Sequence, residues 1–209
     1  MDIDFLWTAL VTLLVTLDPP GLAPIFLSVT DGMSAAERRR VAVRACLIAF
    51  AILTFFGFGG QALLDALGIG LPAFRIAGGL LLFYIAFEMT FELRSKRKQE
   101  SATTAITQDH IQNVAAFPLA IPLMAGPGAI TATILLAGRA EGDIPSLIGL
   151  VGILAFGVAS CFVVFLAAQR VSNWLGVMGN IVLTRLLGVI LAALAIQFVI
   201  DGVMALARG

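Results

Sequence analysis

Two short motifs rich in proline and glycine interrupt apolar stretches of this 209-residue chain. The first is Asp18-Pro19-Pro20-Gly21, inside an apolar run over residues 3–29. The second is Ala125-Gly126-Pro127-Gly128-Ala129, inside a run over residues 113–137. Proline removes a backbone donor and clashes with the preceding helical turn, so each motif predicts a broken helix. In a membrane the freed backbone groups need partners in protein or in a water-filled cavity, so paired breaks indicate a binding site.

The chemistry of these breaks suits a small zwitterion. Half-helix N-termini present backbone N–H groups, which can bind a carboxylate, and half-helix C-termini present carbonyls, which can bind an ammonium group. Asp18 adds a negative charge, and the glycines allow a ligand to approach the backbone closely. The candidate substrate-binding residues are Asp18, Pro20, Gly21, Gly126, Gly128 and Thr131.

Several of these candidates have structural alternatives. Asp18 could cap a half-helix that begins at Pro19, or it could be a membrane carboxylate that binds an ammonium group or a proton, and the two roles can coexist. Thr131 could contact substrate, although a threonine in an apolar helix usually bonds its own backbone. Arg75 and Arg185 either snorkel to the interface or form a symmetry-related pair of gating or anchoring residues.

The composition excludes several classes of protein. Hydrophobic residues make up 60% of the chain and charged residues only 12%, whereas a soluble domain carries about 25% charged residues. The net charge is zero, so no nucleic-acid partner is expected. With one histidine, His110, and two cysteines in apolar segments, Cys46 and Cys161, we expect no metal, no cofactor and no enzymatic activity.

The apolar runs predict how the helices are placed in the bilayer. Ser34 and Glu37 have capping-box spacing and predict the start of the second helix. Lys and Arg residues concentrate on one side of the topology, which is expected to be cytoplasmic, so both termini are expected outside. Six transmembrane helices are predicted, over residues 3–29, 41–63, 71–93, 113–137, 145–169 and 180–207.

The six spans divide into two similar halves. Residues 1–93 and 113–209 each hold three spans, and a polar cytoplasmic linker, 94–112, joins them. Pro20-Gly21 in the first half matches Pro127-Gly128 in the second, and Arg75-Ile76-Ala77-Gly78 and Arg185-Leu186-Leu187-Gly188 follow these pairs at a similar spacing. A unit with an odd number of spans must insert upside down relative to its copy, as in many secondary transporters. The predicted fold is an all-α polytopic membrane protein with two inverted three-helix repeats, the first helix of each broken at a Pro/Gly motif.

Three segments resemble the MarC family of bacterial inner-membrane proteins, which is also described as a neutral amino-acid transporter family. They are Asp18–Leu27, Phe74–Gly79 and Pro118–Ile130. Pro20 departs from the aliphatic residue that is commoner at that position in the family. The resemblance implies a multi-pass protein of the bacterial inner membrane that moves small neutral amino acids such as glycine and alanine. It also implies coupling to protons or another ion, and a distant similarity to exporters of the LysE type.

We therefore predict a secondary transporter of small neutral amino acids that works by alternating access in the lipid bilayer, with H⁺ or Na⁺ as coupling cation. Two alternatives stay open: an exporter of other small metabolites or drugs, and a non-transporting membrane accessory protein. The second does not explain why both halves carry a matched helix break. The sequence leaves the exact substrate, the direction of transport and a homo-oligomeric state open.

Overall fold

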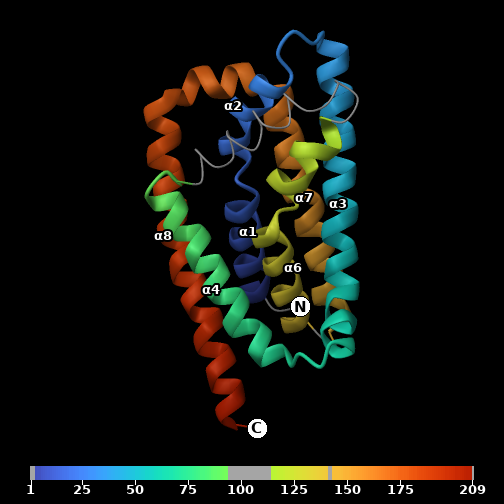
Figure 1. Cartoon of the computed structure of the whole chain (residues 1–209), viewed down its shortest axis with the longest axis vertical. Coiled ribbons are helices and arrows are strands. Elements are labelled where there is room, and N and C mark those ends of the chain that lie inside the picture. Colours follow the sequence, from blue (N-terminus) through green and yellow to red (C-terminus); the bar gives the residue numbers. More distant parts are fainter. Residues whose placement is uncertain (1–2, 94–113, 141–142, 209) are drawn as a thin grey trace.

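The computed structural model describes residues 3–93, 114–140 and 143–208, and every regular element in these ranges is helical. The predicted linker, 94–112, lies outside the described residues. The helices form an elongated bundle (Figure 1). In chain order they are α1 (Ile3–Leu17), α2 (Pro19–Val29), α3 (Ala35–Ala66), α4 (Leu71–Thr90), the π-helical η1 (Ala115–Met124), α6 (Pro127–Arg139), α7 (Ile144–Leu166) and α8 (Ala168–Arg208).

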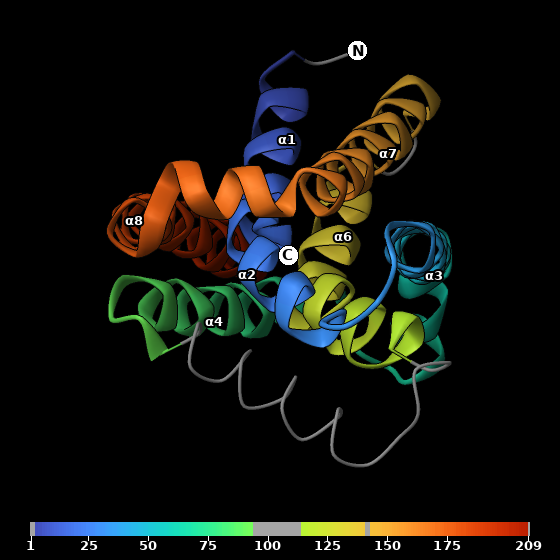
Figure 2. The same cartoon turned by 90° about the horizontal axis from the view of Figure 1, so that it is seen from above.

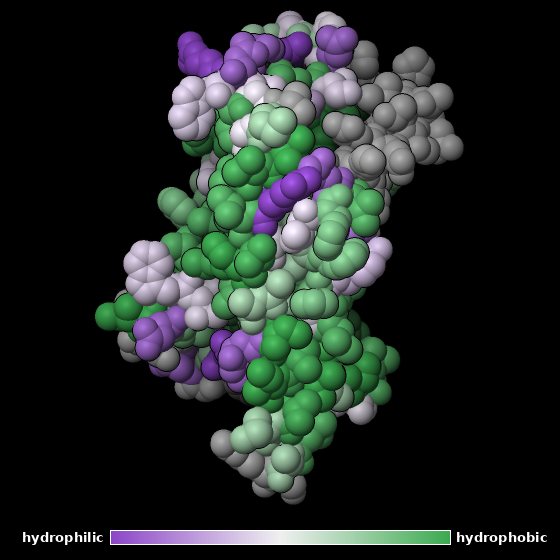
Figure 3. Space-filling view, turned by 90° about the vertical axis from the view of Figure 1, so that its left-hand side faces the viewer, coloured by the Kyte–Doolittle hydropathy of each residue, from purple (hydrophilic) through white to green (hydrophobic). Residues whose placement is uncertain are grey.

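The described helices are long enough and apolar enough for five membrane spans, or six if the bent pair of η1 and α6 counts as one. With 13 residues α6 reaches about 20 Å, which is shorter than the ~30 Å hydrocarbon core, so it needs η1 to cross. The face formed by α4 and α8 is mostly hydrophobic, with hydrophilic atoms gathered at one end and in smaller patches (Figure 3). Such a surface suits contact with lipid.

Local sequence signals explain where the helices begin. The first turns of α2, α4, α6 and α7 all contain proline, whose missing N–H would have no helical acceptor there. The predicted capping box at the start of α3 is confirmed. Ser34 N–H donates to Glu37 Oε2 at 2.8 Å, and Glu37 N–H donates to Ser34 Oγ at 3.4 Å.

The segment between the predicted fifth and sixth spans is helical as well. α8 begins at Ala168, and only Gly176 leaves the helical conformation, at φ 59° and ψ −177°. Glycine adopts a positive φ without a steric penalty, so the helix can turn sharply there. The residues before the turn lie across one end of the bundle, and the rest of α8 descends along it (Figure 1).

α4 and α8 run antiparallel and approach each other closely. A Cβ added at Gly79 would lie 2.7 Å from the carbonyl oxygen of Ala195, and one added at Gly188 would lie 3.0 Å from that of Ala86. Each helix thus supplies a glycine that admits the backbone of the other, as is common where transmembrane helices pack.

α6 occupies the centre of the bundle. It contacts α1, α3 and α4, and nearly every residue from Gly128 to Gly138 is buried, as expected for a helix that is apolar all round. Viewed from above, α2 and α6 lie in the middle, with α3, α4, α7 and α8 around them (Figure 2). The start of α1 and the end of α8 lie toward the same end of the bundle (Figure 1), which we call the terminal end.

Candidate functional site

The first predicted break is present at Asp18, which lies between α1 and α2. Asp18 adopts the left-handed conformation, φ 55° and ψ 60°, which aspartate tolerates better than most residues. Its Oδ1 accepts a hydrogen bond from Gly21 N–H at 3.2 Å, and its backbone carbonyl accepts one from Leu22 N–H at 3.2 Å. The side chain is buried, with 3% of its surface exposed. Asp18 therefore caps α2, as one of its two predicted roles requires.

This arrangement leaves the first break rich in acceptors. Pro19 carries no N–H, so the carbonyl of Val15, four residues earlier, lacks its usual helical donor. The Gly21 N–H group is already used by Asp18. The carboxylate of the expected zwitterion therefore finds no unused N–H group in the first turn of α2. The Val15 carbonyl and the Asp18 carboxylate suit a cation instead.

The second predicted break, between η1 and α6, has the opposite polarity. Its helices bend by 57°, and α6 begins at Pro127 with Gly126 as N-cap and no side chain that caps it. Gly126 carbonyl accepts from Ile130 N–H at 3.0 Å. The N–H groups of Gly128 and Ala129, in the first turn, have no acceptor within the helix. They lie at the positive end of the α6 dipole and suit an anion.

Glycine is required at both breaks because other groups lie where a side chain would begin. A Cβ at Gly21 would fall on the Asp18 carboxylate, and one at Gly126 would fall on the carbonyl oxygen of Pro122. A Cβ at Gly128 would meet the tip of Ile85. The three predicted glycines thus permit close contacts.

Ile85 of α4 places the two breaks near each other. Its Cδ1 lies against Gly128, and it belongs to the same small buried cluster as Val15 in the last turn of α1. Asp18, Gly21, Gly126 and Gly128 are all buried. Figure 1 shows both breaks inside the bundle rather than at its ends.

The other predicted residues take different positions around this centre. Thr131 is buried with 7% exposure, and its methyl group packs against Gly78 of α4, where an added Cβ would lie 2.6 Å away. Pro20 is half-buried, whereas Pro127 is exposed. These two prolines are thus the residues of the breaks with the most accessible surface.

Arg75 and Arg185 lie away from the breaks, at opposite ends of the α4–α8 pair. Arg75 Nη2 donates to the carbonyl oxygen of Gly138 at 3.5 Å, near the end of α6. Arg185 forms an ion pair with Glu92, which follows α4. Both arginines tie separate helices together.

Sequence reasoning missed one acidic residue near the breaks. Glu88, late in the third predicted span, has only 3% of its surface exposed. It lies one helical turn beyond Ile85 on α4, on the side of the helix that is buried. A carboxylate buried within a transmembrane helix is costly and is commonly functional. The spacing between Ile85 and Glu88 places both on one side of α4. It could have indicated that Glu88 is buried only once Ile85 was known to be buried.

Comparison with known proteins supports the family resemblance. The model of the MarC family, described as integral membrane proteins, matches residues 3–207. A UPF0056 membrane protein from Methanocaldococcus jannaschii is 35% identical over 208 residues, which cover 97% of this chain and 98% of the relative. The UPF0056 membrane protein YhcE from Escherichia coli is 34% identical over 200 residues, covering 94% of this chain and 91% of YhcE.

A relative from Archaeoglobus fulgidus, also a UPF0056 membrane protein, is 35% identical over 202 residues, 96% of this chain and 92% of its own. No solved structure matches the chain. The similarity first noted in segments 18–27, 74–79 and 118–130 therefore extends over nearly the whole length of this chain. With its broken helices and apolar spans, the chain belongs to the MarC family of integral membrane proteins.

Proposed function

We propose that this protein is a secondary transporter of small neutral amino acids, with glycine and alanine as the first candidates, and that the two helix breaks form its substrate site. The observation that carries the proposal is the opposite polarity of the breaks. Asp18 and the carbonyl of Val15 suit an ammonium group, and the N–H groups of Gly128 and Ala129 suit a carboxylate. An α-amino acid carries both groups one carbon apart.

An inverted repeat is part of the proposal, and the pairing of α4 with α8 supports it. Gly79 in the first half and Gly188 in the second each admit the backbone of the opposite helix. Glu92 lies near the end of the third predicted span of the first half, and Asp201 lies near the end of the third predicted span of the second half. Each of these carboxylates forms an ion pair with an arginine at its own end of the helix pair. A two-fold axis between the halves would produce such correspondences, and rocking of one half against the other would expose the site alternately.

The coupling cation is proposed to be H⁺ or Na⁺, and Asp18 and Glu88 are its candidate ligands because both carboxylates are buried. The terminal end of the bundle is proposed to face outward, since Lys and Arg concentrate toward the other side. No catalytic role, cofactor or metal is proposed.

The proposal is tested by uptake of labelled glycine and alanine into liposomes that contain the purified protein, with and without a pH or sodium gradient. Gly128→Val should abolish uptake because its side chain would cover the N–H groups that open α6. Gly152→Val on α7 is the matched control, since a Cβ there has nothing within 4 Å. The proposal is contradicted if no neutral amino acid moves in response to either gradient, or if both variants transport equally.

A further inference from the structure

A polar hollow of about 360 Å³ opens at the terminal end of the bundle, between the start of α1, the end of α6 and the start of α7. Its lining combines two carboxylates, a guanidinium group and two hydroxyl groups, which together complement a solute with both charges. The Thr8 hydroxyl donates to the carbonyl of Asp4 at 2.8 Å, and the Ser146 hydroxyl donates to Asp143. The lining residues are Asp4, Phe5, Thr8, Arg139, Asp143 and Ser146.

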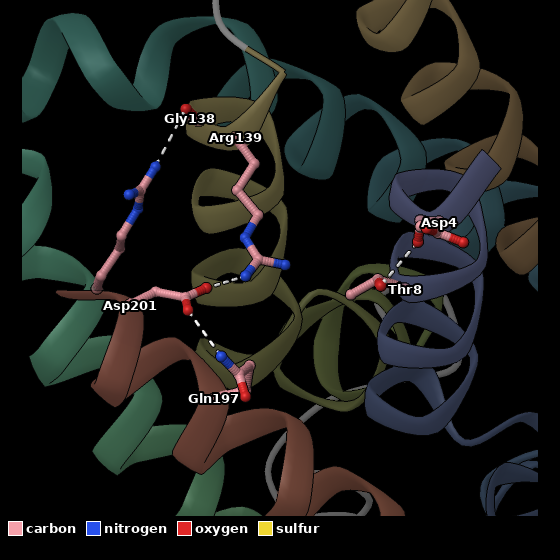
Figure 4. A network of polar contacts seen from close by, with 7 residues as sticks. Asp4, Thr8, Gly138, Arg139, Gln197 and Asp201 are labelled. Carbon is pink, nitrogen blue, oxygen red and sulfur yellow. Dashed lines mark hydrogen bonds and ion pairs between the residues drawn. The ribbon is translucent and has the colours of Figure 1, made fainter. Parts of the chain in front are cut away.

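Arg139 links this hollow to α8. It forms an ion pair with Asp201, and its guanidinium carbon lies 4.9 Å from the centre of the Phe198 ring. Gln197 Nε2 donates to Asp201 Oδ1 at 2.8 Å and holds the carboxylate in place. Figure 4 shows Arg139 between this pair on α8 and the Asp4–Thr8 pair on α1. The ion pair therefore ties α6 to α8 beside the hollow.

A row of threonines leads from the hollow toward the first break. Thr8, Thr12 and Thr16 are spaced four residues apart, so they share one side of α1. Thr8 lines the hollow, whereas Thr16 lies two residues before Asp18. α1 and α6 are in contact.

Thr12, in the middle of the row, differs from its neighbours. The hydroxyls of Thr8 and Thr16 donate to the carbonyls four residues earlier, at 2.8 Å each. The Thr12 side chain is fully buried, and its hydroxyl has no hydrogen-bond partner among the described residues. A buried hydroxyl without a partner is unusual and calls for a ligand or water in another state of the protein.

We infer that the route from the terminal end to the substrate site runs along this threonine row, and that the Arg139–Asp201 ion pair is its gate. When the pair separates, α6 moves away from α1 and α8, Arg139 is freed toward the hollow, and the Thr12 hydroxyl meets water or the passing solute. The inference rests on the proposed alternating-access mechanism. It adds the residues that open the substrate site toward the terminal end of the bundle.

Thiol labelling tests the route without any solute. Thr12→Cys is placed in a chain whose two buried cysteines, Cys46 and Cys161, are replaced by alanine, and a charged, membrane-impermeant reagent is added from the terminal side. Because minor open states are typically populated at about 0.1–10%, the thiol introduced at position 12 should react at about that fraction of the rate of an exposed thiol. Leu13→Cys is the matched control, because Leu13 is equally buried but lies on another side of α1.

Asp201→Asn, which removes the gate, should raise the labelling rate at position 12 by about two- to fivefold, the shift expected from losing one partly exposed ion pair. The rate at position 13 should stay low in both backgrounds. The inference is overturned if position 12 reacts no faster than position 13, or if Asp201→Asn accelerates both equally, which would indicate general loosening. Labelling at position 12 without amino-acid uptake would support the route and contradict the proposed substrate. Amino-acid uptake without labelling at position 12 would support the proposed substrate and contradict the route.

Discussion

The two roles of Asp18 can be separated by three substitutions. Asparagine caps helices about as well as aspartate and also tolerates the left-handed conformation, so Asp18→Asn should change stability little. Glycine fits that conformation freely and costs only a few tenths of a kcal/mol as an N-cap. Alanine loses the cap, at about 1 kcal/mol, and adds about 1–2 kcal/mol of backbone strain at φ 55°.

Thermal unfolding in detergent should therefore rank the proteins as wild type and Asp18→Asn first, then Asp18→Gly, then Asp18→Ala. For a chain of this size a loss of about 2–3 kcal/mol corresponds to roughly 4–12 °C in Tm. Circular dichroism can follow unfolding, because the regular elements among the described residues are helices.

Transport should follow a different order. If the Asp18 carboxylate binds the ammonium group, its removal loses a charged hydrogen bond worth about 1.5–3 kcal/mol, or a tenfold to 150-fold rise in KM. Asp18→Asn and Asp18→Gly should both show this loss although Asp18→Asn is stable. If Asp18→Asn takes up substrate as well as the wild type does, Asp18 is a helix cap and does not bind the ammonium group. Equal stability of Asp18→Asn and Asp18→Ala would refute the capping argument itself.

Three further substitutions have defined outcomes. Gly21→Ala should impair uptake as severely as Asp18→Asn does, because the added Cβ would displace the Asp18 carboxylate that caps α2. Normal uptake by Gly21→Ala would contradict that geometry. Gly188→Val should lower the free energy of unfolding by about 1–3 kcal/mol, as overpacking does, and hence lower the melting temperature. Gly152→Val, which faces open space, should leave the melting temperature unchanged, and circular-dichroism melts of both variants decide this. Glu88→Gln should abolish uptake driven by an ion gradient while keeping exchange of labelled for unlabelled glycine, and retained gradient-driven uptake would remove Glu88 from coupling.

Local features of the fold were readable from the sequence. The break at Asp18, the break near Gly126 and the capping box at Ser34 each depend on residues within a few positions of one another. Proline and glycine restrict or free the backbone wherever they occur, so their effects need no knowledge of distant contacts. The helical character and the apolar spans follow from composition for the same reason.

Long-range contacts could not be read from one sequence. Arg139 and Asp201 pair although they lie far apart in the chain, and the burial of Glu88 depends on which side of α4 meets the rest of the bundle. The sequence also assigned no polarity to each break as a whole, since both the N–H and the carbonyl ends of a broken helix are available in principle. Only the bond from Gly21 to Asp18 shows that this N–H group is already used there.

The claim that both breaks bind one solute is tested most directly by substrate protection. Pro20→Cys and Pro127→Cys replace the two most accessible residues of the breaks, and Pro72→Cys, at the start of α4, serves as control. Glycine should slow thiol labelling at positions 20 and 127 with the same half-maximal concentration and leave position 72 unaffected. Protection at one break only, or at neither, would contradict a shared site.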